Sequence, residues 1–152
     1  MAILNRFSTT NDDLNRRGRN AFWGSAIGFA GFSLGVGLTI AANFGQDDWR
    51  LYALAGVNMA ACLVAVLAMT VGRRRPELAM LAVIAAGDMA VIAGAAILTG
   101  AGIPLGFLII ATAVLLAILT THRGWTFTLI GAATFGGLAA IVLQLVALPQ
   151  QL

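Results

Sequence analysis

The fold is decided by residues 77–99, which read ELAMLAVIAAGDMAVIAGAAILT. A helix that crosses a bilayer needs about 20 mostly apolar residues. This run is long enough, and Asp88 is the one charged residue in its interior. An acidic side chain at bilayer depth is costly and usually faces protein or water instead of lipid. We therefore expect Asp88 to point inward, with other helices of the chain around it.

The composition of the whole chain is that of a membrane protein. Of its 152 residues, 60% are hydrophobic and 10% are charged, whereas soluble domains carry about 25% charged residues. All nine basic residues are arginines, mostly in short clusters between apolar stretches, which is typical of charge that sets membrane topology and not of a nucleic-acid interface. The single cysteine, Cys62, excludes an intrachain disulfide. The single histidine, His122, excludes a haem with two His ligands and a His-rich metal site within one chain.

Four more apolar stretches supply the helices around Asp88. We predict an all-α integral membrane protein, a five-helix transmembrane bundle with spans at about residues 21–44, 51–71, 77–99, 103–120 and 126–148. A basic cytoplasmic tail at residues 1–20 and a short external tail at residues 149–152 complete this organisation. A cleaved signal peptide is the alternative for the first span, but its apolar core is longer than the 7–15 residues of such a peptide.

The arginines predict the orientation of the bundle. The N-terminal tail, the 72–76 loop and the 121–125 turn carry eight of the nine arginines, so the positive-inside rule places the N-terminus in the cytoplasm and, after five spans, the C-terminus outside. Tryptophans favour membrane interfaces, and Trp23, Trp49 and Trp125 all fall at span ends. We expect a multi-pass protein of the bacterial inner membrane. The arginines that determine this topology are Arg16, Arg17, Arg19, Arg73, Arg74 and Arg75.

Small residues form stripes along two of the predicted spans. In the first span Gly24, Gly28, Gly31 and Gly35 are spaced by four, three and four residues and lie on one helix face. Such a face lets a second helix approach closely, so it is either a docking face for another subunit or a packing face for spans of the same chain. A stripe in the third span, which predicts close packing on that side, comprises Ala79, Ala82, Ala86, Ala90 and Ala93.

Asp88 has polar residues near its own depth in neighbouring spans. Folding the second and third spans into a hairpin brings Asn58 within two residues of its level, or roughly 3 Å along a helix, and Ser33 falls close to that level as well. An intramembrane cluster of Asp88, Asn58 and Ser33 is therefore expected. Three roles stay open for it: an interhelical hydrogen-bonded clamp between Asp88 and Asn58, contact with a lipid, quinone, pigment or partner subunit, and a proton or ion relay.

Two short basic segments resemble those of a known class. Residues 12–20, DDLNRRGRN, lead directly into a span, and residues 71–79, VGRRRPELA, join two spans. Together they resemble the N-terminal membrane region of multi-spanning bacterial sensor proteins with histidine kinase or nucleotide cyclase domains. The resemblance implies a membrane input module without its effector domain, since no kinase or cyclase motif is present. No active-site residue carries over from it.

Two hypotheses about function remain. The first is a non-enzymatic accessory or assembly subunit of a larger inner-membrane complex, respiratory or photosynthetic, which contacts the lipid bilayer and other membrane subunits or a second copy of itself. The second is the membrane input module of a signalling protein. The sequence holds no Ser–His–Asp set and no paired carboxylates in a cleft, so we expect no enzyme activity, no catalytic or metal-binding residue and no bound cofactor.

Overall fold

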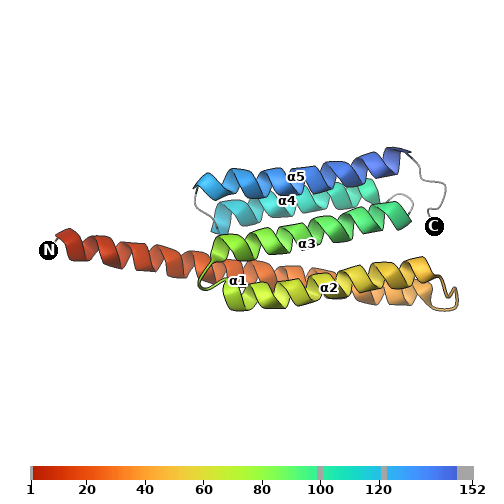
Figure 1. The fold of residues 1–152 in the computed structure, drawn as a ribbon, viewed down its shortest axis with the longest axis horizontal. Helices are drawn as coiled ribbons and strands as arrows, with labels where there is room; N and C mark the ends of the chain where they lie inside the picture. The colour runs from red at the N-terminus through yellow and green to blue at the C-terminus, as the bar shows by residue number, and fades with distance from the viewer. Residues whose placement is uncertain (1, 99–100, 121–122, 147–152) are drawn as a thin grey trace.

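The structure, a computed structural model, describes the backbone of residues 2–98, 101–120 and 123–146 and the side chains of residues 12–98, 101–115 and 124–146. In these residues the chain forms an antiparallel bundle of five helices (Figure 1): α1 (Ala2–Asn43), α2 (Trp49–Val71), α3 (Pro76–Ile97), α4 (Gly102–Thr120) and α5 (Arg123–Val146). Helix α3 contacts each of the other four helices. The stretch that carries Asp88 is therefore the one around which the bundle is arranged.

Four segments of the described chain are long and apolar enough to cross a bilayer. They are Asp12–Asn43, Trp49–Val71, Pro76–Ile97 and Gly124–Val146. Length and composition thus confirm the prediction of an all-helical, multi-pass membrane protein. Helix α4 is shorter, at 19 residues, or about 28 Å at 1.5 Å per residue. A fifth crossing by α4 stays a prediction, as does the orientation of the bundle.

Helix α1 differs from the predicted arrangement of a tail followed by a span. It runs without interruption over 42 residues from Ala2 to Asn43, so residues 2–20 continue the first span as helix, and its N-terminal part extends beyond the other helices (Figure 1). The sequence has no proline before Pro76 to end this helix. The one glycine in residues 2–20, Gly18, lies where α1 touches the α2–α3 turn: a Cβ there would lie 3.1 Å from the Cα of Arg73.

The interior of the bundle is built mainly from small side chains. Ten of the sixteen buried hydrophobic residues in the described part of the chain are alanines, while large apolar side chains such as Leu34, Leu63 and Phe135 are exposed. Small residues let helix backbones approach closely, which is how helices associate where lipid is as apolar as leucine. The exposed large side chains give the bundle an apolar surface suited to contact with a bilayer.

A hydrogen-bonded turn joins α1 to α2 at one end of the bundle. Gly45 and Asp47 adopt positive φ angles of 85° and 53°. The Oδ1 atom of Asn43 accepts a hydrogen bond of 2.8 Å from the backbone N–H of Asp48. Asp48 caps α2 by accepting from the backbone N–H of Arg50 at 2.9 Å and pairs with its guanidinium at 2.7 Å. These side-chain and backbone hydrogen bonds from Arg50 lower the pKa of Asp48 below its ordinary value.

An ion pair fastens α1 to α3 at the other end. The Nη1 atom of Arg17 lies 2.9 Å from Oε1 of Glu77, and its Nε atom lies 3.0 Å from Oδ2 of Asp13 on the preceding turn of α1. Both Arg17 and Glu77 are largely shielded from solvent, with side chains 16% and 20% exposed. Pro76 begins α3, where its missing N–H removes no helical hydrogen bond.

Candidate functional site

Asp88 lies on the side of α3 that faces α5. Its carboxyl group packs against Gly136 so closely that a Cβ atom added to this glycine would overlap the carboxyl group and lie 2.6 Å from the Cβ of Asp88. The Oδ1 atom is buried and has no hydrogen-bond partner in the described part of the chain. The glycine is needed because only a residue without a side chain leaves room for the carboxyl group between the two helices.

Asn58 lies at a different helix pair, on the side of α2 that faces α1. Its Oδ1 atom is 2.6 Å from the position that a Cβ of Gly35 would occupy, and its Nδ2 donates a hydrogen bond of 3.0 Å to the carbonyl oxygen of Leu54. The expected hydrogen bond between Asp88 and Asn58 is therefore not formed, and this part of the prediction is corrected. The two helices turn these side chains toward different neighbours, Asp88 toward α5 and Asn58 toward α1.

Ser33 contacts α2 instead of Asp88. Its hydroxyl oxygen lies 3.6 Å from the sulfur of Cys62. Ser33 and Asn58 thus both lie along the α1–α2 pair, while Asp88 belongs to the α3–α5 pair. In the part of the chain that the structure describes, no hydrogen bond joins Asp88 to Asn58 or to Ser33. What it holds at Asp88 is a single carboxyl group between two helices, and not a chain of ionisable groups.

The glycines of α1 divide between two intrachain contacts and an open face. Gly24 is buried. A Cβ on Gly28 would lie 2.9 Å from Val83 of α3, and Gly35 is covered by Asn58 of α2, whereas nothing lies within 4 Å of the Cβ position of Gly31. The stripe is therefore not one interface, because α1 crosses from α3 toward α2 along its length.

The packed face of α3 coincides only in part with the predicted alanine stripe. Ala79 is buried, Ala82 is exposed, and the other three members of the stripe are half-buried. The other buried residues of α3 include Met80, Val83, Ile84 and Gly87. The prediction counted small residues alone, but α3 touches four helices and buries larger side chains where the neighbouring helices leave room.

A closely packed pair of helices that the sequence analysis missed is α4 with α5. Gly102 and Gly106 are four residues apart on α4, and Cβ atoms there would lie 2.5 Å from the carbonyl oxygen of Ala140 and 2.6 Å from that of Gly137. The Oε1 atom of Gln144 accepts a hydrogen bond of 3.0 Å from the N–H of Gly102, the first residue of α4. The G-x-x-x-G spacing is a known signal of close helix pairs, but the predicted span of residues 103–120 left Gly102 outside the helix.

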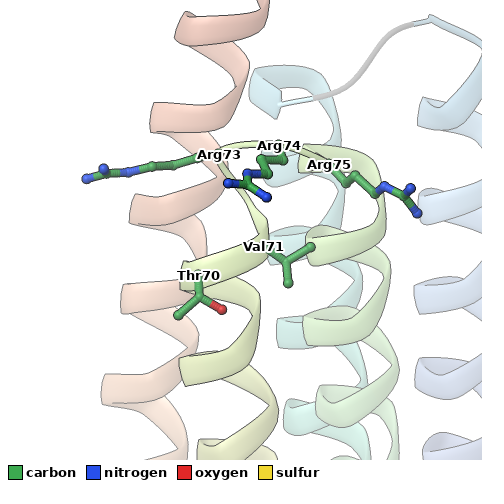
Figure 2. Close-up of a pocket in the computed structure, with 5 residues that line it drawn as sticks. All are labelled: Thr70, Val71, Arg73, Arg74 and Arg75. Atoms are coloured by element: carbon green, nitrogen blue, oxygen red, sulfur yellow. The ribbon is translucent and has the colours of Figure 1, made fainter.

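The arginines predicted to determine topology lie at one end of the bundle and differ in their partners. Arg16 and Arg17 pair with acidic residues of α1 and α3. Arg73, Arg74 and Arg75 form the exposed turn between α2 and α3. They line an open pocket of about 400 Å³ together with Thr70 and Val71 (Figure 2).

No arrangement that could hold a metal ion is found among the residues that the structure describes, because no three His, Cys, Asp or Glu side chains come together there. His122 lies outside the described residues. Compared with models of protein families, with curated proteins and with solved structures, the chain matches none.

Proposed function

We propose that this protein is a non-enzymatic accessory or assembly subunit of a larger complex in the bacterial inner membrane, and that α1 provides its docking face. The observation that carries the proposal is the exposure of α1. In the apolar stretch of 18 residues that qualifies α1 as a possible membrane span, only 11% is buried within the bundle. The corresponding share is 28–39% in the other three long apolar helices. Among these four helices, α1 therefore has the largest exposed share, which supports a docking face on it.

The exposed face of α1 has the shape that a second helix fits. Ile27, Gly31, Leu34 and Leu38 are spaced by four, three and four residues and form one stripe. The three large side chains are 61%, 64% and 63% exposed, and the space around Gly31 is open. A glycine between large apolar residues makes a notch where a partner backbone can approach closely.

Co-purification from native membranes tests this proposal. Gly31→Leu fills the notch on α1, and Gly131→Leu makes the same change at an exposed glycine of α5 that also has nothing within 4 Å. We expect Gly31→Leu to release a partner that the wild type and Gly131→Leu retain, with no loss of thermal stability of the purified chain in either variant, because both gain a similar helix propensity. If the set of retained proteins is the same in all three samples, α1 faces lipid and the proposal is wrong.

The orientation is part of the proposal and is tested separately. In a Cys62→Ala background, a single cysteine is introduced at Asp47 or at Arg74, which lie in turns at opposite ends of the bundle. The arginine distribution predicts that a membrane-impermeant maleimide labels intact cells at position 47 and not at position 74. Labelling at position 74 would reverse the proposed orientation.

A sensor input module is the second candidate, and the environment of Asp88 favours it. A carboxyl oxygen that is buried and has no hydrogen-bond partner among the described residues lies between two helices, so a proton or ligand that reached it would change how α3 packs on α5. Co-purification with a kinase or cyclase, and loss of its regulation in Asp88→Asn with the fold intact, would support this candidate over an assembly subunit.

A further inference from the structure

The α2–α3 turn carries an unusual amount of unneutralised positive charge. Residues 12–19 and 72–77, which meet at this end of the bundle, contain six arginines and three acidic residues. Two of the acids, Asp13 and Glu77, are paired with Arg16 and Arg17. None of the ion pairs in the described part of the chain involves Arg73, Arg74 or Arg75. Among the described residues, these three guanidinium groups therefore have no carboxylate partner.

These arginines surround a pocket that is open to the outside. Its volume of about 400 Å³ lies in the range of small-molecule sites, about 300–1,000 Å³. Figure 2 shows the Arg74 side chain over Val71, between Arg73 and Arg75, which point away to opposite sides. The guanidinium carbon of Arg73 lies 6.0 Å from the centre of the Phe22 ring on α1, a distance at which the ring attracts the cation. Arg74 is thus the arginine best placed to bind a ligand in the pocket.

Four other donors of the turn are already in use. The backbone N–H of Gly72 donates to Ala68 at 2.7 Å, and those of Arg74 and Arg75 both donate to Val71 at 2.9 Å. The hydroxyl of Thr70 donates to the carbonyl oxygen of Leu67 at 2.7 Å. The guanidinium groups are available to bind an anion, and their planar array of donors matches the oxygens of a phosphate group.

Apolar surface lies directly beside this charge. Val71 is 42% exposed, Leu67 on the preceding turn of α2 is 64% exposed, and Leu78 at the start of α3 is 42% exposed. A soluble phosphate ion would make no favourable contact with these apolar side chains, but the acyl chains of a lipid would cover them. The turn also joins two long apolar helices, so it lies at the depth of the lipid headgroups if these helices span the bilayer.

We propose that the pocket formed by Arg73, Arg74 and Arg75 binds the phosphate headgroup of an anionic phospholipid, with Arg74 as its main ligand. The acyl chains lie along Leu67, Val71 and Leu78. Basic side chains near a membrane surface each contribute about 1 kcal/mol to attraction for anionic lipid, which is about fivefold in affinity. The site is independent of the α1 docking face, which lies on another helix.

Native mass spectrometry of the purified full-length protein tests the site by counting bound lipids. The protein is titrated with phosphatidylglycerol and with phosphatidylcholine of the same acyl chains. Arg74→Gln removes the central charge. Arg16→Gln removes the same charge from an exposed arginine that already pairs with Asp13. We expect the wild type to prefer phosphatidylglycerol, Arg74→Gln to bind it about fivefold more weakly, and Arg16→Gln to bind it like the wild type.

Three results would overturn the proposal: equal binding of the two lipids, equal loss in both variants, or full competition by glycerol 3-phosphate, which has the phosphate but no acyl chains. Circular dichroism of each variant without added lipid shows whether it is folded. If Arg74→Gln does not fold, Arg75→Gln takes its place, with a smaller but measurable loss expected. An unchanged affinity in the folded variant refutes the site.

Discussion

Gly136→Ala is the sharpest test of how α3 packs on α5. The added methyl group would overlap the carboxyl group of Asp88 and lie 2.6 Å from its Cβ, so the helices must separate or Asp88 must move. Forcing a methyl group into a packed contact typically costs about 1–3 kcal/mol. Replacing glycine by alanine in a helix also gains about 1 kcal/mol in helix propensity, which offsets part of that cost.

The matched control is Gly131→Ala on the same helix, where nothing lies within 4 Å of the new methyl group. It gains the same propensity and meets no steric cost, so the free energies of unfolding of the two variants should differ by about 1–3 kcal/mol, with Gly136→Ala the less stable. Unfolding in mixed micelles of increasing SDS content, followed by circular dichroism, measures this difference. Equal stability of the two variants would mean that α3 and α5 do not meet at Asp88.

A double-mutant cycle assigns the cost to the carboxyl group. Asp88→Ala removes the atoms that overlap the new methyl group and leaves the Cβ at 2.6 Å. The penalty of Gly136→Ala should therefore be smaller in the Asp88→Ala background but should not vanish. Residues in contact usually show coupling of about 0.5–3 kcal/mol. Additive effects would place the strain elsewhere along the α3–α5 contact.

Three further predictions concern the ends of the helices. Gln144→Leu removes the acceptor for the first N–H of α4, at Gly102. It should lower the free energy of unfolding by about 1 kcal/mol, as the loss of a helix cap does, and the SDS-unfolding assay should show this loss. Gln144→Glu keeps the acceptor and should retain most of the stability. The hydrogen bonds from Arg50 lower the pKa of Asp48 in the folded state, so they stabilise the fold above the unfolded pKa of about 3.9. This contribution is lost as the pH falls through the lower, folded pKa. The stability of the wild type should therefore fall more steeply below about pH 4 than that of Asp48→Asn, and parallel pH curves would contradict this. Glu77→Gln breaks the ion pair between α1 and α3. It should lower the free energy of unfolding by about 1 kcal/mol, near the upper end for pairs close to a surface. The loss should shrink in high salt, and a salt-independent loss would point to a packing change instead.

The sequence by itself determined the class of the protein and the positions of its helices. Apart from the N-terminal end of α1, apolar runs of membrane-spanning length predicted helices that the structure places within a few residues of the expected bounds, as for residues 51–71 compared with Trp49–Val71. This works because hydropathy and helix length are local properties of the chain. The pairing of Asp48 with Arg50, two residues apart, is local as well.

Other features needed the tertiary structure. Depth along the bundle can be counted from the turns, and this count predicts similar depths for Asp88 and Asn58, but the rotation of each helix about its axis cannot be counted in this way. The structure turns Asp88 toward Gly136 and Asn58 toward Gly35. Which face of a helix meets which neighbour depends on the fit of many side chains at once. The continuous helix from Ala2 to Asn43 also differs from the predicted tail, because a polar segment with no proline can extend an apolar helix beyond the bundle.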